Sequence, residues 1–196
     1  MRLVLASASP RRAELLTAAG FRFETRAVEI DERVRPGEPP QVYVRRLAAE
    51  KSAAALANLE GHDVVVLGAD TAVVVDGHIL GKPVDDADAA AMLRRLSGRR
   101  HEVMTGVSLR DATAEIGCTE VTSVEFAALS DWDVAWYVAS GEGRDKAGAY
   151  AVQGLGSRFV PRIQGSYSNV VGLPVAAVHA LLSLIASGAG SGYSER

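Results

Sequence analysis

The stretch DVVVLGADTAVVVDGHIL, residues 63–80, contains two valine-rich apolar runs separated by Gly-Ala-Asp at 68–70. Continuous apolar runs of this kind are typical of strands that are buried on both faces. Asp-Gly at 76–77 is a dipeptide that favours a tight hairpin turn. The stretch therefore predicts buried strands of an α/β fold, with the carboxylate of Asp70 where the first run ends.

The rest of the chain mixes strand-like and helix-like patterns. We expect further strands over residues 2–6, 21–28, 102–110, 117–129 and 157–163, and helices over 10–19, 40–59, 85–97, 131–139 and 174–187. Ser9 is a candidate N-cap, and Ser130 with Asp133 matches a capping box. The proline-rich charged stretch 29–40 and the stretch 165–174 are expected to be loops.

Length and composition bound the class of protein. We expect residues 1–187 to form a single domain and 188–196 a disordered tail. The net charge of −3 argues against stable nucleic-acid binding, and the single cysteine, Cys118, excludes a disulfide framework. With neither a signal peptide nor an apolar run that could span a membrane, we expect a cytoplasmic protein with no membrane partner.

The basic residues are strongly biased toward arginine. Only three of the 21 are lysines, namely Lys51, Lys82 and Lys146. A chain that uses arginine for generic positive charge would keep lysine where a compact ammonium is needed, because the guanidinium is a planar fork of different reach. The three lysines are therefore candidate site residues, although chance could also leave three lysines anywhere.

The stretch LASASPRRAELL, residues 3–14, places two arginines at the start of a helix, where the helix dipole disfavours cations. Free backbone N–H groups at such a position bind phosphate well. The Ser7 hydroxyl and the charge-assisted donors of Arg11 and Arg12 would suit a polyphosphate. The alternative is a capped surface helix with two solvated arginines.

Lys51 falls on the apolar face of the helix expected over residues 40–59. Val44, Leu47 and Ala55 mark that face at three- and four-residue spacing. A lysine inside such a stripe either extends along it to reach water or points into a lined cavity.

Asp70 follows a buried run, and open α/β sheets usually bind their ligands beyond the ends of buried strands. A carboxylate there suits a metal ligand or a general base, and the alternative is a turn or capping aspartate. Asp31 and Glu32 could supply a second carboxylate for magnesium, although a solvated charged loop is the simpler interpretation.

Gln153 is one of only three glutamines. Its side-chain amide can donate to a pyrimidine carbonyl while it accepts from the N3–H group, which matches the imide edge of uracil or thymine. The same amide can also pair with other bases.

Four separated stretches, taken together, resemble the Maf family of nucleoside triphosphate pyrophosphatases. They are LASASPRRAELL (3–14), YVRRLAAEKS (43–52), VLGADTAVVVDGHILGKP (66–83) and DKAGAYAVQGLGSRFVPRIQGSYSNVVGLP (145–174). The resemblance implies an elongated mixed β-sheet with flanking helices, forming two lobes around a central cleft. It also implies hydrolysis of the α–β phosphoanhydride of a nucleotide, with a divalent cation, Mg²⁺ or Mn²⁺, as cofactor.

Carried over by motif, the resemblance assigns roles to individual residues. The residues implied to hold the triphosphate are Ser7, Arg11, Arg12, Lys51 and Lys82. Asp70 is implied as a general base or metal-associated carboxylate, aided by Glu32. The candidate catalytic residues are thus Asp70, Lys51 and Lys82, and the candidate metal ligands are Asp70 and Glu32.

Other matched positions bear on the choice of substrate. Thr71 and Gln153, together with Arg11, occupy positions linked to that choice in the family. Asp145 and Lys146 lie in the last matched stretch and are further candidate substrate-binding residues.

Within the family, the motifs PRR, ADT and AYAVQGLG resemble the branch that acts on dTTP and UTP. The expected function is therefore a dTTP/UTP pyrophosphatase that clears normal or modified pyrimidine nucleotides. The alternatives are a pyrophosphatase for CTP, 7-methyl-GTP or modified nucleotides, and a nucleotide-binding regulator of cell division with little turnover. A homodimer is compatible with the sequence.

Overall fold

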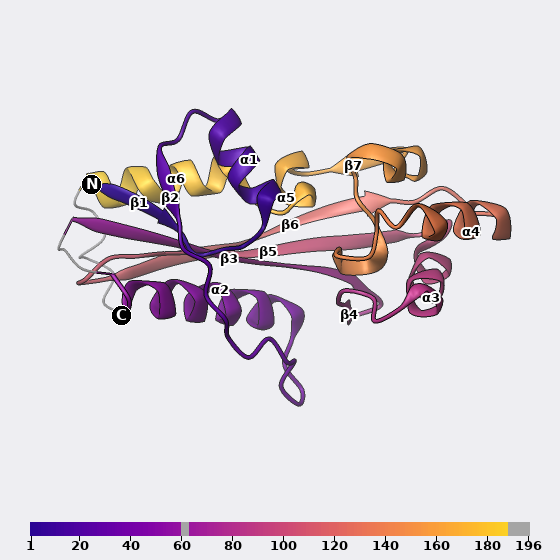
Figure 1. Ribbon diagram of the computed structural model, residues 1–196, viewed down its shortest axis with the longest axis horizontal. Coiled ribbons are helices and arrows are strands. Elements are labelled where there is room, and N and C mark those ends of the chain that lie inside the picture. Colours follow the sequence, from indigo (N-terminus) through magenta and orange to yellow (C-terminus); the bar gives the residue numbers. More distant parts are fainter. Residues whose placement is uncertain (60–62, 188–196) are drawn as a thin grey trace. The chain divides into compact units, whose positions relative to one another are not determined.

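The computed structural model describes residues 1–59 and 63–187, so the tail expected over 188–196 lies outside the described residues. Its elements, in chain order, are β1 (Arg2–Leu5), α1 (Pro10–Ala18), β2 (Phe23–Thr25), α2 (Pro40–Leu56), β3 (Val64–Val75), β4 (His78–Leu80), α3 (Asp86–Leu96), β5 (Arg100–Arg110), β6 (Glu115–Glu125), α4 (Asp131–Ser140), the 3₁₀ helices η1 (Ala147–Ala149) and η2 (Gly154–Phe159), β7 (Arg162–Gln164), α5 (Tyr167–Val171) and α6 (Val175–Ala186) (Figure 1). Within residues 1–59 and 63–187, no helix is both long enough and apolar enough to cross a membrane.

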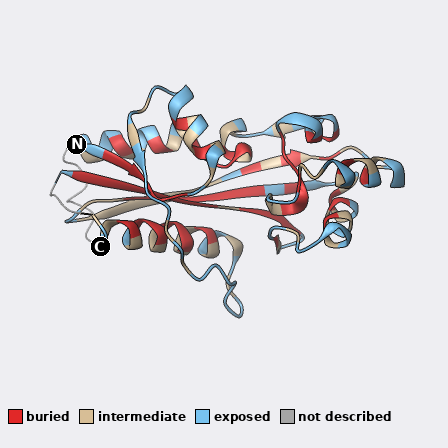
Figure 2. Cartoon of the chain, in the orientation of Figure 1, coloured by how far each residue is buried: buried red, intermediate tan, exposed pale blue. Residues whose placement is uncertain are grey.

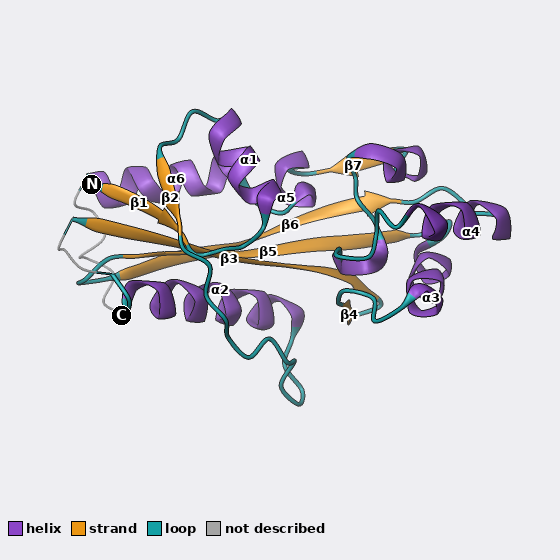
Figure 3. Ribbon diagram, in the orientation of Figure 1, coloured by secondary structure: helices purple, strands orange, loops and turns teal. Residues whose placement is uncertain are grey.

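The strands form one seven-stranded mixed sheet in the order β2-β1-β3-β5-β6-β7, with β4 paired to β3. β1 runs parallel to both β2 and β3, whereas β4 is antiparallel to β3 and β7 is antiparallel to β6. Helices lie between many of these strands along the chain, although β4 directly follows β3 and β6 directly follows β5 (Figure 3). The predicted fold class, a mixed α/β sheet with flanking helices, is confirmed.

The described residues divide into two compact units. The first unit comprises residues 1–59, 63–70, 105–120 and 172–187, and the second comprises Thr71–Met104 and Val121–Val171. The long strands β3, β5 and β6 each contribute residues to both units.

In the first unit, the two-residue period of the strands separates two cores. Leu5 of β1 and Leu67 of β3 belong to a cluster with α1 and α6, whereas Val4 and Val66 belong to a cluster with Ala55 of α2. Strands buried on both faces read as continuous apolar runs, which is why the sequence of β3 shows no alternation. Figure 2 shows this burial along β1 and β3.

Two glycines allow α2 to lie close against its face of the sheet. A Cβ atom on Gly68 would lie 2.1 Å from the carbonyl oxygen of Ala48, and one on Gly106 would lie 2.2 Å from that of Val44. Contacts that short are sterically forbidden, so a side chain at either position would push the helix away. Glycine at these two positions therefore allows a short distance between α2 and the strands β3 and β5.

The core of the second unit contains a buried histidine among aromatic rings. The His101 ring makes edge contacts with Phe126 and Tyr150, and its Nε2 atom hydrogen-bonds to the Tyr150 hydroxyl at 2.8 Å. Burial lowers the pKa of His101 to about 4, because the charged imidazolium would lose its hydration there. The histidine is therefore neutral at pH 7.

Most predicted local signals are confirmed. The turn between β3 and β4 has positive φ at both Asp76 (52°) and Gly77 (75°), as a two-residue hairpin turn of this kind requires. The Ser130–Asp133 capping box is present at the start of α4. The two apolar runs of 63–80 form a single uninterrupted strand, β3, so the expectation that Asp70 ends a strand is wrong: it lies inside β3.

Three local predictions are wrong. Ser9 precedes α1 but its side chain caps nothing, and its backbone N–H donates instead to the Ser7 hydroxyl at 3.2 Å. The strand expected over 157–163 is divided between η2 and β7. The loop expected over 165–174 contains the short helix α5. In segments this short, packing against the rest of the fold outweighs the weak intrinsic preference of the residues for strand or loop.

We expect Gly68→Ala to lower the free energy of unfolding by about 2 kcal/mol or more, because the new methyl group would meet backbone atoms of α2 that cannot move independently. Gly81→Ala is the matched control, since its Cβ would have nothing within 4 Å. Urea unfolding of both variants measures the difference, and equal stabilities would refute the close-approach interpretation.

We also expect the free energy of unfolding to fall between pH 7 and pH 5 by about 2 kcal/mol through His101, whose lowered pKa leaves the unfolded chain binding more protons in that window. His101→Phe should flatten this pH dependence, whereas replacement of the exposed His78 by asparagine should not. A slope unchanged in His101→Phe would contradict the assignment.

Candidate active site

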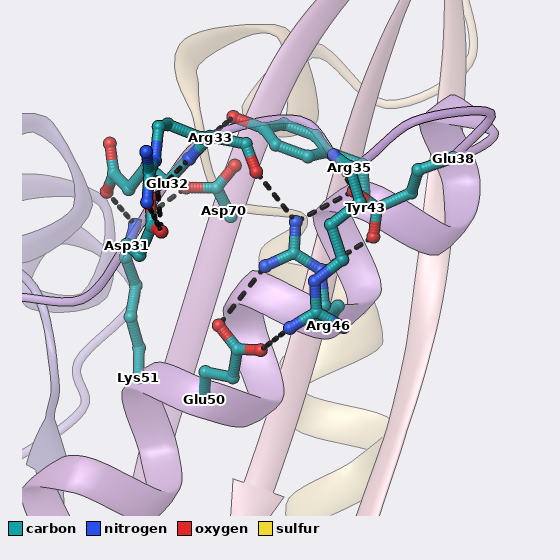
Figure 4. A network of polar contacts seen from close by, with 10 residues as sticks. All are labelled: Asp31, Glu32, Arg33, Arg35, Glu38, Tyr43, Arg46, Glu50, Lys51 and Asp70. Atoms are coloured by element: carbon teal, nitrogen blue, oxygen red, sulfur yellow. Dashed lines mark hydrogen bonds and ion pairs between the residues drawn. The ribbon is translucent and has the colours of Figure 1, made fainter.

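The centre of the candidate site is the ammonium group of Lys51. Its Nζ atom lies 2.6 Å from Oδ1 of Asp70 and 2.7 Å from Oε1 of Glu32. Lys51 belongs to the inner face of α2 with Val44 and Leu47 and is only 8% exposed. Of the two alternatives for Lys51, the side chain does not extend to water but is buried against two carboxylates (Figure 4).

The alternation of β3 explains why Asp70 meets Lys51. Gly68 faces α2, and Asp70, two residues further along an uninterrupted strand, lies on the same face. Asp70 is 8% exposed and bonded to Lys51, so its interpretation as a turn or capping aspartate is wrong. A buried carboxylate of this kind requires a charged partner, and Lys51 provides it.

Glu32 reaches Lys51 from the charged loop that precedes α2. The Tyr43 hydroxyl donates to the Glu32 carbonyl oxygen at 3.0 Å. Arg46 donates to the carbonyl oxygen of Arg33 at 3.2 Å and to both oxygens of Glu38, at 2.6 and 2.7 Å. Two side chains of α2 therefore fix this loop at several points, as Figure 4 shows.

Tyr43 is a weaker acid than an exposed tyrosine. Burial raises the pKa of Tyr43 to about 12, and the negative charges of Asp70 and Glu32 shift it in the same direction.

Asp31, the other candidate carboxylate of the loop, makes an ion pair with Arg33 at 2.6 Å. Glu32, rather than Asp31, is thus the second carboxylate beside Lys51.

The arginines at the start of α1 differ in their surroundings. Arg12 is 8% exposed and donates to the Ser7 hydroxyl at 3.0 Å and to the Gly172 carbonyl oxygen at 2.9 Å. Burial lowers the pKa of the Arg12 guanidinium, and the charges of Asp70 and Glu32 partly oppose this. The alternative of a solvated surface arginine is therefore wrong for Arg12. The negative charges of Asp70 and Glu32 offset the repulsion between its guanidinium and the positive end of the helix dipole.

Arg11, its neighbour, is half-buried. Ser7 is buried, with 7% of its surface exposed. Hydrogen bonds, ion pairs and charge interactions within the first unit thus bring together five of the predicted residues, namely Ser7, Arg12, Glu32, Lys51 and Asp70.

The remaining predicted residues belong to the second unit. Lys82 and Gln153 are exposed, and Gln153 immediately precedes η2. The Nζ atom of Lys146 lies 2.5 Å from an Asp145 oxygen and 2.9 Å from the Glu142 carbonyl oxygen. The backbone bond from Gly148 N–H to the Gly81 carbonyl oxygen brings the segment after Lys146 beside the segment of Lys82. Thr71 is half-buried and follows Asp70 on β3.

The donor set suits a divalent cation held jointly with a substrate. Among the described residues, no three His, Cys, Asp or Glu side chains gather as a metal site. Glu32 and Asp70, however, both direct a carboxylate oxygen toward one point, the Lys51 ammonium. Magnesium is commonly bound by one or two carboxylates together with substrate phosphates, so these two residues fit such a role.

Sequence reasoning missed Tyr43 and Arg46. Both lie in the stretch 43–52, but their partners are backbone carbonyl oxygens and a glutamate of the preceding loop. The one signal that could have found them is the side-by-side placement of an aromatic and a basic residue on the turns of α2 that precede Lys51.

We expect Lys51→Met to lower the free energy of unfolding by about 3 kcal/mol, since it leaves the buried Asp70 carboxylate without its ammonium partner. The double variant Lys51→Met/Asp70→Asn should lose less than the two single variants together, because it removes both charges. Denaturant unfolding of the cycle measures this coupling. Simple additivity would show that the pair does not interact.

Comparison with known proteins agrees with the motifs. The family model described as Maf-like protein matches residues 2–185. A protein of Anaeromyxobacter dehalogenans (strain 2CP-C), named dTTP/UTP pyrophosphatase, is 55% identical over 185 residues that cover 92% of each chain. A Shewanella oneidensis protein of the same name is 55% identical over 189 residues, covering 93% of this chain and 97% of its own.

Solved structures support the fold. A HAM1 protein from Coxiella burnetii superposes with a TM-score of 0.52 at 17% identity, covering 95% of this chain and 99% of its own. The Staphylococcus aureus Ham1 protein gives a TM-score of 0.51 at 16% identity, with coverage of 96% and 99%. Because the family model spans residues 2–185 and relatives more than half identical cover over nine-tenths of the chain, the protein belongs to the Maf-like protein family.

Proposed function

We propose that this protein is a nucleoside triphosphate pyrophosphatase that hydrolyses dTTP and UTP to the nucleoside monophosphate and pyrophosphate. The observation that carries the proposal is the Lys51 ammonium, buried between Asp70 and Glu32. Family membership and the shared name of relatives such as those from Anaeromyxobacter and Shewanella support the activity and its substrates.

The cations of the first unit suit the binding of a triphosphate. The Lys51 ammonium has three N–H donors, of which Asp70 and Glu32 accept two, and a phosphate oxygen can accept the third. Arg12 supplies a guanidinium, which favours phosphate oxygens in a fork geometry. These donors are held by protein contacts in advance, so they can stabilise charge that develops on the leaving pyrophosphate without reorganising.

Asp70 is the residue we assign to the attacking water. Its carboxylate can orient the water or accept its proton for in-line attack at the α-phosphorus. A bound Mg²⁺ or Mn²⁺ ion, held by Asp70 and Glu32, would supply further neutralisation of phosphate charge. Asp70 would therefore both activate the water and hold the metal ion, and Glu32 would share only in holding the metal ion.

We assign further residues to recognition of the nucleotide. The Gln153 amide matches the imide edge of uracil and thymine. Thr71 and Arg11 contribute to the choice of substrate, and Lys82, Asp145 and Lys146 contact the nucleotide. A cytoplasmic location, a homodimer and the absence of stable nucleic-acid binding stay predictions of the sequence.

We expect Asp70→Asn to lower kcat by about 100-fold or more, because the amide cannot accept the proton of the attacking water. Release of pyrophosphate from dTTP, UTP, CTP, GTP and 7-methyl-GTP is measured at saturating Mg²⁺ or Mn²⁺. Asp131→Asn, at a carboxylate that is 91% exposed, is the matched control and should behave as wild type.

Wild-type turnover in Asp70→Asn would refute the general-base assignment. A wild-type preference for CTP or 7-methyl-GTP would refute the choice of substrate. Tight nucleotide binding without release of pyrophosphate would favour the nucleotide-binding regulator.

We expect Lys51→Arg and Lys82→Arg each to lower kcat/KM by about 10-fold or more, although both keep the positive charge, because the guanidinium is a planar fork on a stem of different reach. Steady-state kinetics with UTP measure the change. Arg162→Lys, the opposite exchange at an exposed position, is the control and should leave kcat/KM unchanged. If both lysine variants match the wild type, a compact ammonium is not required at either position.

A further inference from the structure

The carboxylate of Glu142 joins α4 to the start of η2. Its Oε2 atom accepts from the Tyr137 hydroxyl at 2.7 Å and from the Gly156 N–H at 2.9 Å, and its Oε1 atom accepts from the Leu155 N–H at 2.9 Å. The N–H groups that open a helix lack partners within it, and here a side chain from the turn after α4 satisfies two of them. Gln153 is the residue that immediately precedes η2.

The same pair of residues also holds the rest of the connecting segment. The Tyr137 hydroxyl, in a side chain 1% exposed, accepts from the Ala151 N–H at 3.0 Å. The backbone carbonyl oxygen of Glu142 accepts from the Lys146 ammonium at 2.9 Å. Glu142 and Tyr137 therefore contact the segment 146–156 on both sides of Gln153, through hydrogen bonds from four of its residues.

This segment is strained and closely packed. Ala149 has a φ of +58°, which a non-glycine residue adopts only at a cost, and it is buried. A Cβ atom on Gly154 would lie 2.2 Å from the Glu142 Oε1 atom, so the carboxylate fills the space beside the backbone there. A strained backbone persists only when its surroundings over-determine it, and such strain is frequent at functional segments.

The chemistry of an amide explains why a fixed Gln153 matters. Uracil presents a carbonyl oxygen beside an N–H group, whereas cytosine presents an amino group beside a ring nitrogen acceptor. A glutamine that can turn its amide over can satisfy either pattern, since one end donates and the other accepts. Discrimination between the two bases therefore requires a site whose polar groups are held in place, so that the wrong base leaves them unpaired.

We propose that Glu142, acting together with Tyr137, is a positioning residue for base selection: it fixes the backbone of Gln153, and so the point from which the exposed amide reaches the base, which selection of uracil and thymine over cytosine requires. This inference rests on the proposed function and on the role of Gln153 in it. Glu142 itself touches no reacting group and acts only through the segment that it holds.

The test is the isosteric substitution Glu142→Gln. Its amide nitrogen cannot accept a hydrogen bond, so at least one donor among Tyr137, Leu155 and Gly156 loses its acceptor. We expect the ratio of kcat/KM for UTP to kcat/KM for CTP to fall by about 10-fold or more, mainly through KM for UTP, because discrimination through fixed polar groups is large when they are held in place. The value of kcat at saturating UTP should stay near that of the wild type.

Tyr137→Phe provides an independent second variant. It keeps the buried ring but removes the hydroxyl that bonds to both Glu142 and Ala151, so the same ratio should fall. Glu102→Gln, at an exposed carboxylate on β5 in the same unit, is the matched control and should leave the ratio unchanged. If Glu142→Gln does not fold, the ratio of kcat/KM for UTP to kcat/KM for CTP in Tyr137→Phe tests the inference alone.

An unchanged ratio in Glu142→Gln and Tyr137→Phe would overturn the inference, whether or not their melting temperatures fall. Failure of the proposed function is seen separately, as no release of pyrophosphate by the wild type. In that case, calorimetric binding of α,β-methylene-UTP and α,β-methylene-CTP to the wild type and Glu142→Gln replaces the kinetics. A binding ratio equal in both proteins would then overturn the inference.

Discussion

The buried Lys51 ammonium bonds to both Asp70 and Glu32, and these two ion pairs connect α2, β3 and the loop before α2. Removing the charges of Lys51 and Asp70 from water is costly, and such a pair persists only when its geometry is good and its hydrogen bonds are satisfied. β3 provides that geometry by carrying Asp70 on the α2 face without interruption. Gly68 lets α2 approach closely enough for the lysine to reach the carboxylate.

The cluster also explains the unusual start of α1. Arg12 occupies a helix terminus that disfavours cations, and it is buried besides, yet Asp70 and Glu32 oppose both penalties. Cations and carboxylates of the first unit therefore stabilise one another in the folded protein. A triphosphate with a divalent cation would bring the same two kinds of charge to this cluster, which is the physical reason for assigning phosphate chemistry to it.

Periodicity and local chemistry predicted much of this structure. The apolar runs of 63–80 predicted buried strands. The apolar spacing around Lys51 placed this lysine on the inner face of its helix, and the position of Asp70 after an apolar run marked it as a candidate site residue. Contacts between distant residues could not be predicted. Tyr43 and Arg46 bind backbone atoms of another segment, and their side-by-side placement on α2 does not indicate which atoms those are. Composition marked Lys82 and Lys146 as candidates and amide chemistry marked Gln153, and the family resemblance then assigned roles to these residues of the second unit.

In the proposed mechanism, the α-phosphorus of a pyrimidine nucleotide is attacked beside Lys51 and Asp70. The decisive measurement is a crystal structure of the protein with α,β-imido-UTP and Mg²⁺. The α-phosphate should lie within hydrogen-bond distance of the Lys51 ammonium, with a water molecule between it and Asp70. A nucleotide bound with its phosphates away from both residues would rule this mechanism out.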